Sequence, residues 1–282
     1  MAAMSDHHEH EHDLGLSHDL PIMVSRRRAL GIFGAGIGAV LAGCGSSDKG
    51  ASTGTTTSSS ATSTTATTTG SAASSTSAVP EETGGPFPGD GTNGPNVLTE
   101  SGVVRQDIRT SIGDASGTAT GAEATVALKL IDVQGGGGPL AGAAIYIWHC
   151  TADGKYSLYE DDVAGENFLR GVQESDADGN VTFTTIYPGT YAGRWPHIHF
   201  EVYESLEAAT TASQKLRTSQ IALPQEACEK VYAAGGYGNS AANLAQLSID
   251  TDMVFSDGYG TQLATVTGAP GDGLTMRLNI GV

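Results

Sequence analysis

The chain has 282 residues, of which 31 are Asp or Glu and 14 are Lys or Arg, so its formal charge is −17. That charge argues against nucleic acid and anionic membrane surfaces as partners, because both repel an acidic protein. Charged residues make up only 16% of the chain and 39 residues are glycine, a composition that favours a loop-rich β protein.

The first 43 residues are predicted to be a pre-sequence followed by an export signal. Residues 1–24 are mostly polar, and four histidines among acidic neighbours leave a metal-binding tract as an alternative to an unstructured segment. Arg26–Arg28 then precede the apolar, glycine-rich run Ala29–Ala42. Fourteen residues are too few to span a bilayer but suit the apolar core of a signal peptide. Arginines directly before such a core predict twin-arginine export.

The signal ends in Leu41-Ala42-Gly43-Cys44, which resembles a bacterial lipoprotein cleavage site. We expect Cys44 to carry a lipid and to anchor the protein at the outer face of the cytoplasmic membrane or at the cell surface. Residues 44–95 are predicted to be a linker and an irregular lead-in, because residues 51–78 contain only Ala, Ser, Thr and Gly.

A globular domain is expected over residues 96–282. Short apolar or alternating runs separated by Gly-rich turns predict an all-β fold, an antiparallel β-sandwich with long loops and a few short helices. The predicted helices are Glu204–Ala212 and Pro224–Ala234. The predicted strands are Ala124–Asp132, Ala143–His149, Val181–Ile186, His197–Tyr203 and Met276–Ile280.

Two histidines on the fourth of these strands, His197 and His199, are the central chemical feature. Residues i and i+2 of a strand point to one face, so both imidazoles can reach one metal ion. The turn Pro188-Gly189 would fold Tyr191 back toward that point, and Tyr156 lies in a comparable loop after the second strand. Two imidazoles with two phenol oxygens suit ferric iron, which prefers anionic oxygen ligands. From these residues alone, packing histidines and buried turn aromatics remain the alternative.

Several motifs in order along residues 80–282 resemble those of the intradiol ring-cleavage dioxygenases, the family of protocatechuate 3,4-dioxygenase and catechol 1,2-dioxygenase. The resemblance rests on a Pro-Gly-x-Tyr turn, an arginine and a His-x-His strand, with further matches on both sides. The matching stretches are Glu82–Phe87, Gly154–Ser157, Phe168–Gln173, Thr185–Gly189, His197–His199 and Thr218–Gln220.

The resemblance implies a non-haem Fe(III) site and a β-sandwich fold. The metal ligands would be Tyr156, Tyr191, His197 and His199. Tyr191 would leave the metal and take up a substrate proton, while Arg194 stabilises developing charge and Gln220 assists it. The implied reaction opens a catechol-type ring between its two hydroxylated carbons with O2, giving a cis,cis-muconate-type diacid. Relatives in the family assemble, so a homodimer is one option for this chain.

Two other functions remain open. A three-histidine site formed by His149, His197 and His199 would bind zinc or copper, as in cupin-like or dismutase-like proteins. A non-catalytic, lipid-tethered sandwich would bind polysaccharide or another protein.

Tyr187 is the alternative to Tyr191 as the second oxygen ligand, since it lies only four residues earlier. We prefer Tyr191 because the ligand of the family follows Pro-Gly.

Two cysteines fall in the globular domain, Cys150 and Cys228. In an exported protein the oxidising compartment favours a disulfide between them. The alternative is that Cys150 acts as a thiolate ligand beside His149, which would suit zinc or copper better than ferric iron.

Overall fold

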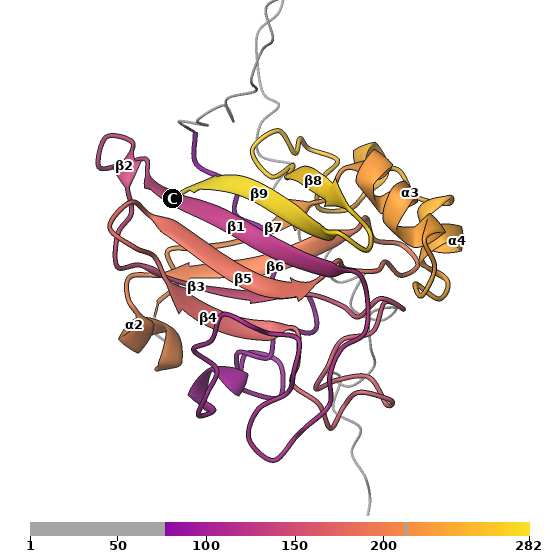
Figure 1. Ribbon diagram of the computed structural model, residues 1–282. Helices are drawn as coiled ribbons and strands as arrows, with labels where there is room; N and C mark the ends of the chain where they lie inside the picture. Colours follow the sequence, from indigo (N-terminus) through magenta and orange to yellow (C-terminus); the bar gives the residue numbers. More distant parts are fainter. Residues whose placement is uncertain (1–76, 212–213) are drawn as a thin grey trace, which may run out of the picture. The chain divides into compact units, whose positions relative to one another are not determined.

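The computed structural model describes residues 77–211 and 214–282, which form two packed β-sheets with short helices at their ends (Figure 1). The predicted signal, Cys44 and the Ala/Ser/Thr/Gly segment before residue 77 lie outside the described residues. Within the described ranges, no helix is both long enough and apolar enough to cross a membrane. The all-β sandwich predicted from the sequence is confirmed.

The first sheet has five strands around β1, with β9 paired to it in parallel and the other pairs antiparallel. Burial alternates along β1, because one face of this sheet packs on the core and the other faces outward. The strands are β1 (Glu123–Asp132), β2 (Gly138–Pro139), β5 (Asn180–Ile186), β8 (Thr265–Ala269) and β9 (Gly273–Gly281).

The second sheet has four antiparallel strands in the order β4-β3-β6-β7. They are β3 (Ala144–Trp148), β4 (Arg170–Glu174), β6 (His197–Tyr203) and β7 (Arg217–Ala222). Every residue of β3 and β6 is buried. Ile198 and Phe200 of β6 point into the core between the sheets, whereas Tyr146 and Trp148 of β3 belong to a second cluster on the opposite face. The second sheet is therefore covered on both faces.

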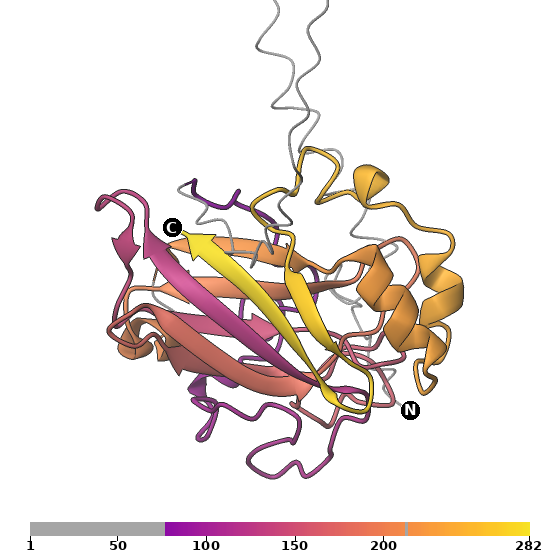
Figure 2. The same ribbon diagram turned by 45° about the horizontal axis from the view of Figure 1, so that its top comes forward.

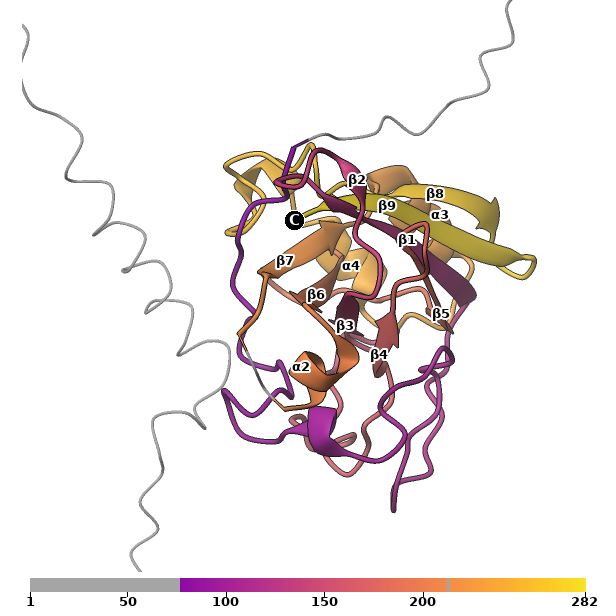
Figure 3. The same cartoon turned by 90° about the vertical axis from the view of Figure 1, so that its left-hand side faces the viewer.

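An N-terminal strap, which we define as residues 79–98, runs past β7 toward α2 (Figure 3). The Val79 amide donates to the Gly281 carbonyl at 3.0 Å, and the Glu82 amide donates to the Thr218 carbonyl at 2.8 Å. Further along, the Lys215 ammonium lies 2.5 Å from an Asp90 carboxylate oxygen of the strap. Val97 and Leu98 then enter the second apolar cluster. These contacts fasten the start of the strap to β9 of the first sheet and the rest of it to the second sheet.

The helices lie around the ends of the sheets, with α3 and α4 together at one end and α2 at the other (Figures 1 and 2). Their bounds are η3 (Val97–Thr99), α2 (Leu206–Thr210), α3 (Gln225–Ala233), α4 (Ser240–Leu244) and η4 (Ile249–Thr251). The predicted strands and the two predicted helices are present; β6 has the predicted bounds, and the other elements have shifted ends. The sequence analysis missed β2, β4, β7, β8, α4 and the short helices η3 and η4, because segments this short carry little periodicity.

Candidate metal centre

Side chains of two tyrosines and two histidines converge at one end of β6. The Tyr156 hydroxyl lies 3.2 Å from Nε2 of His197, and this nitrogen lies 3.0 Å from Nε2 of His199. Tyr191 closes the group: its ring centroid is 5.8 Å from that of Tyr156 and 6.0 Å from that of His197. The structure therefore brings together the four residues that the sequence analysis named as metal ligands.

The histidines owe their placement to strand geometry. His197 and His199 occupy the face of β6 opposite to Ile198, and the ring of Trp148 stacks on His199 with centroids 4.8 Å apart. Nδ1 of His197 lies 2.5 Å from the Trp195 carbonyl oxygen. A carbonyl only accepts, so Nδ1 carries the proton and Nε2 presents a lone pair to the cluster.

Burial keeps both imidazoles neutral. It lowers the pKa of His197 to about 3 and holds the pKa of His199 well below its usual value. Nδ1 of His199 is buried and has no hydrogen-bond partner among the described residues. Two neutral imidazoles that meet nitrogen to nitrogen, one with a lone pair already turned inward, form an arrangement that a cation between them would fit.

The tyrosines come from loops and supply oxygen donors. Burial raises the pKa of Tyr156 well above its usual range and raises the pKa of Tyr191 to about 12. Both phenols are therefore protonated when no cation is near, and a bound metal would favour their ionised form. Two nitrogens and two phenol oxygens suit a hard cation such as ferric iron better than a soft one.

The turn before Tyr191 reaches the Tyr156 loop through a close backbone contact. The Gly189 amide donates to the Thr151 carbonyl at 3.1 Å. A Cβ at Gly189 would lie 2.3 Å from the Ala152 carbonyl oxygen, which no side chain permits. The Pro-Gly pair thus bends the chain and also lets the two tyrosine-bearing loops touch.

Beside the cluster, Arg194 is buried in a fixed orientation. Its Nε donates to Oδ2 of Asp252 at 3.0 Å, and its Nη2 donates to Oε1 of Gln220 at 2.7 Å. Burial alone would lower the pKa of Arg194, but the neighbouring Tyr191 and Asp252 raise it. The amide of Gln220 in turn donates to the Thr83 carbonyl of the strap at 2.9 Å. Arg194 and Gln220, both named from the sequence, therefore lie in one network.

Asp252 is a site residue that the sequence analysis missed. Its carboxylate accepts from the backbone amides of Trp195 at 2.8 Å and Val254 at 2.8 Å, in addition to its ion pair with Arg194. Burial would raise the pKa of this carboxyl, but Arg194 lowers it. A single acidic residue in an irregular segment has no pattern of its own. The only signal was its position two residues before the buried pair Val254-Phe255.

The strap also contributes more than the sequence indicated. A Cβ at Gly85 would lie 3.2 Å from Cε1 of His199, and the φ angle of Gly85 is +74°. Arg170 of β4 ties the strap to the Tyr156 loop: its guanidinium donates to the carbonyls of Phe87 at 3.0 Å and Ser157 at 2.8 Å. The lead-in that we expected to be irregular thus forms one wall of the centre.

His149 and Tyr187, the alternative metal ligands considered from the sequence, do not join this cluster. His149 bonds Thr185 through Nε2 at 2.8 Å and the Cys150 carbonyl through Nδ1 at 2.8 Å, so its ring is turned away from the other histidines. Within the part of the chain that the structure describes, no group of three His, Cys, Asp or Glu side chains could hold a metal ion. The Tyr187 hydroxyl contacts Sγ of Cys228 at 3.2 Å. The three-histidine site is therefore not formed, and Tyr187 faces away from the histidines.

The prediction of a disulfide between Cys150 and Cys228 is wrong. Cys150 and Cys228 are both buried and free. The Cys150 thiol donates to the Gly189 carbonyl at 3.5 Å, whereas Cys228 contacts the Tyr187 hydroxyl. Burial raises the pKa of both thiols, which also disfavours a thiolate ligand at Cys150. Each thiol contacts a different partner, so the two cysteines do not meet. An oxidising compartment favours a disulfide only where two thiols lie close together.

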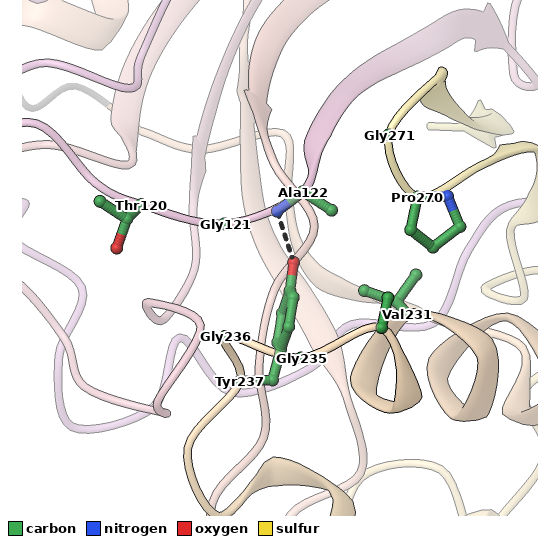
Figure 4. Close-up of a pocket in the computed structure, with 10 residues that line it drawn as sticks. Thr120, Gly121, Ala122, Val231, Gly235, Gly236, Tyr237, Pro270 and Gly271 are labelled. Carbon is green, nitrogen blue, oxygen red and sulfur yellow. Dashed lines mark hydrogen bonds between the residues drawn. The ribbon is translucent and has the colours of Figure 1, made fainter.

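A hollow of about 440 Å³ lies between α3 and the start of β1, away from these residues (Figure 4). Apart from Tyr237, its lining residues are small or apolar, and none carries a carboxylate, an imidazole or a thiol. Its Tyr237 accepts a hydrogen bond from the Ala122 amide at 3.1 Å and donates to the Tyr187 carbonyl at 2.9 Å. This hollow therefore has none of the chemistry of the metal centre.

Comparison with known proteins agrees with this geometry. The family model described as Dioxygenase matches residues 93–214. A chlorocatechol 1,2-dioxygenase from a Pseudomonas species is 33% identical over 84 residues, which is 23% of this chain and 33% of that protein. A catechol 1,2-dioxygenase from Candida albicans is 36% identical over 63 residues, covering 22% of this chain and 20% of that protein. The aligned part thus spans a third or less of these two relatives.

Among solved structures, an intradiol ring-cleavage dioxygenase from Tetranychus urticae is 25% identical and superimposes with a TM-score of 0.51. The match covers 64% of this chain and 87% of that one. Family model, partial relatives and fold agree with the convergence of tyrosines and histidines. Residues 93–214 thus match the Dioxygenase family, and the fold of the chain is similar to that of an intradiol ring-cleavage dioxygenase.

Proposed function

We propose that the protein is a non-haem Fe(III) intradiol dioxygenase. It would open catechol-type rings between the two hydroxylated carbons with O2 and release cis,cis-muconate-type diacids. The observation that carries this proposal is the convergence of two tyrosine oxygens with the facing Nε2 atoms of His197 and His199.

The ligands of the iron would be Tyr156, Tyr191, His197 and His199. When bound, ferric iron would supply the Lewis acidity that binds the catechol oxygens and activates the ring toward O2. Burial of the two imidazoles keeps them neutral, which metal binding by nitrogen requires. The two phenols lose their protons on metal binding and then carry the negative charge that balances the ion.

The two tyrosines are proposed to have different roles. Tyr156 is fully buried between the His197 ring and the ring of Phe87, and its position is fixed on several sides. Tyr191 retains some exposure and is followed by the exposed pair Ala192-Gly193. Tyr191 is thus the phenol with room to move, and its oxygen is the group that would accept a proton from a substrate hydroxyl.

Arg194 is proposed to stabilise negative charge on the substrate. Its Nε is held by Asp252 and its Nη2 by Gln220, so the orientation of the guanidinium is fixed. A buried donor that is already oriented needs no rearrangement when charge develops, and this makes it effective in catalysis.

Metal analysis of the purified protein tests the proposal directly. We expect about one iron per chain, a red-brown colour from phenolate-to-iron charge transfer, and O2-dependent conversion of catechol to a ring-opened diacid. Zinc or copper in place of iron would favour the other metalloprotein. A colourless protein that takes up no iron on reconstitution and leaves catechol intact would refute the dioxygenase function.

We also propose that the domain is exported and tethered through a lipid on Cys44, from the signal-like residues 26–44. Cys44→Ala should abolish incorporation of labelled lipid and release the protein from the membrane fraction. Unchanged processing and membrane association in that variant would contradict the tether.

A further inference from the structure

Helix α4 makes polar contacts with both tyrosine-bearing loops. Ser240, its first residue, is fully buried. The Ser240 hydroxyl accepts from the Thr190 amide at 3.0 Å and donates to the Ala152 carbonyl at 2.8 Å. Thr190 directly precedes Tyr191, and Ala152 lies in the loop that carries Tyr156. One hydroxyl group therefore joins the two loops that supply oxygen donors to the metal centre.

A second side chain of the helix acts on the same turn. The amide of Asn243 donates to the Thr190 carbonyl at 3.1 Å. The Thr190 hydroxyl donates to the Arg194 carbonyl at 2.8 Å. The amide, carbonyl and hydroxyl of Thr190 are thus all bonded. Movement of Tyr191 is then confined to its side-chain torsions, because the preceding backbone is fixed.

The segment that bears Ser240 is itself well anchored. The Ser240 amide donates to the Tyr237 carbonyl at 2.8 Å, and the Tyr237 hydroxyl donates to the Tyr187 carbonyl at 2.9 Å. Apart from Ser240, the loops meet through the amide of Gly189, the Cys150 thiol on the Gly189 carbonyl and the close packing of Gly154 on Thr190. Loss of the hydroxyl would leave the Thr190 amide buried without its acceptor, which is a costly state for a backbone group.

We propose that Ser240, supported by Asn243, is a positioning residue that holds Tyr156 and Tyr191 at the separation the metal requires. This inference rests on the proposed function and deepens it. Both residues lie beyond the stretch 93–214 that matches the family model, in the segment that also carries Asp252. The fixed backbone at Thr190 would let the Tyr191 side chain swing away from a bound metal and return to the same place.

The test compares Ser240→Ala with Ser175→Ala. Ser175 is a matched control: it is also buried and donates to one carbonyl, that of Leu140, but it contacts neither loop. We expect Ser240→Ala to release iron to a chelator about 10- to 100-fold faster than wild type, the range typical of residues that orient ligands. Its phenolate band should shift, and hydrogen exchange in metal-free protein should increase at residues 151–156 and 188–191. Ser175→Ala should match the wild type in all three.

Two further variants distinguish loss of the Ser240 hydrogen bonds from general misfolding. Ser240→Thr retains the hydroxyl and should restore slow iron release, and Asn243→Ala should show a weaker form of the Ser240→Ala defect. Wild-type iron release and exchange in Ser240→Ala, or equal defects in Ser175→Ala, would overturn the inference while leaving the proposed function intact. A wild-type protein that binds no iron would overturn the proposed function as well.

Discussion

The two sheets of the sandwich differ in how their outer faces are used. Along β1 of the five-stranded sheet, buried residues alternate with partly exposed ones, and the same holds for most of β5. In the four-stranded sheet, all seven residues of β6 are buried. One face of β6 packs on the core, and the other faces the strap and the loops that carry the tyrosines.

This difference shows which face of a β-sandwich can hold buried polar and metal-binding side chains. Polar side chains on a buried face need partners, since an unpaired buried polar group costs free energy. On β6 the loops supply those partners for His197, through the Tyr156 hydroxyl and the Trp195 carbonyl, while Lys215 does so for Glu201. Polar residues on the outer face of β1 need no such protein partners, because water can hydrogen-bond to them.

If chemistry is confined to β6, a substitution on the outer face of the first sheet should affect iron binding far less than loss of a β6 histidine. We expect His199→Ala to weaken iron binding by more than the roughly 10- to 100-fold that loss of an outer partner costs, because a ligand itself is removed. The matched change Thr182→Ala, at an exposed position of β5, should leave iron content unchanged. Iron per chain measures both. Full iron in His199→Ala would place the metal elsewhere.

Within the four-stranded half of the molecule, the two sides of the Pro-Gly turn can be compared. Tyr191→Phe should lower turnover of catechols by about 10²- to 10⁴-fold, because it removes the proposed proton acceptor, while part of the iron is retained. Tyr187→Phe removes only a hydroxyl that contacts Cys228 and should keep its activity and visible band. The reverse result would make Tyr187 the ligand.

A smaller effect is expected from the support of Arg194. Asp252→Asn retains the size of the side chain but removes the charge that holds the guanidinium. We expect a loss of about 10- to 100-fold in kcat with little change in KM or iron content, since misorientation affects mainly the transition state. Asp250→Asn, an exposed neighbour, is the control. An unchanged kcat in Asp252→Asn would show that Gln220 alone orients Arg194.

The smallest effect concerns the cysteines. Reductant should leave the thermal midpoint of the domain unchanged, because Cys150 and Cys228 are free. Thiol titration of the denatured, non-reduced protein should detect both. A Cys150–Cys228 cross-linked peptide in a non-reduced digest would contradict the structure.

Much of the fold and the centre of the site were accessible from the sequence because their signals are local. The period of two places His197 and His199 on one face without any knowledge of the rest of the fold. The Pro-Gly turn before Tyr191 and the glycine before Tyr156 are likewise local features. Five strands and the two helices were found for the same reason.

The rest depends on contacts between distant segments. Asp252 meets Arg194 across 58 residues, and Gln220 reaches Thr83 across 137. Neither contact leaves a local pattern. β8 is an exposed edge strand with a glycine near its end, so it lacks the alternation that marks a half-buried strand. The disulfide prediction failed similarly, because cell compartment says nothing about whether two thiols meet.

The parallel pairing of β1 with β9 has a consequence for folding kinetics. Ala124 pairs with Leu274, and the strap joins β7 across a comparable length of chain. Folds dominated by such distant pairings form slowly, since loop closure precedes any gain from contacts. Until the last strand is synthesised, β1 presents an unpaired apolar edge, the kind of edge on which other chains aggregate. Yields of soluble protein should therefore depend steeply on an intact C-terminal strand.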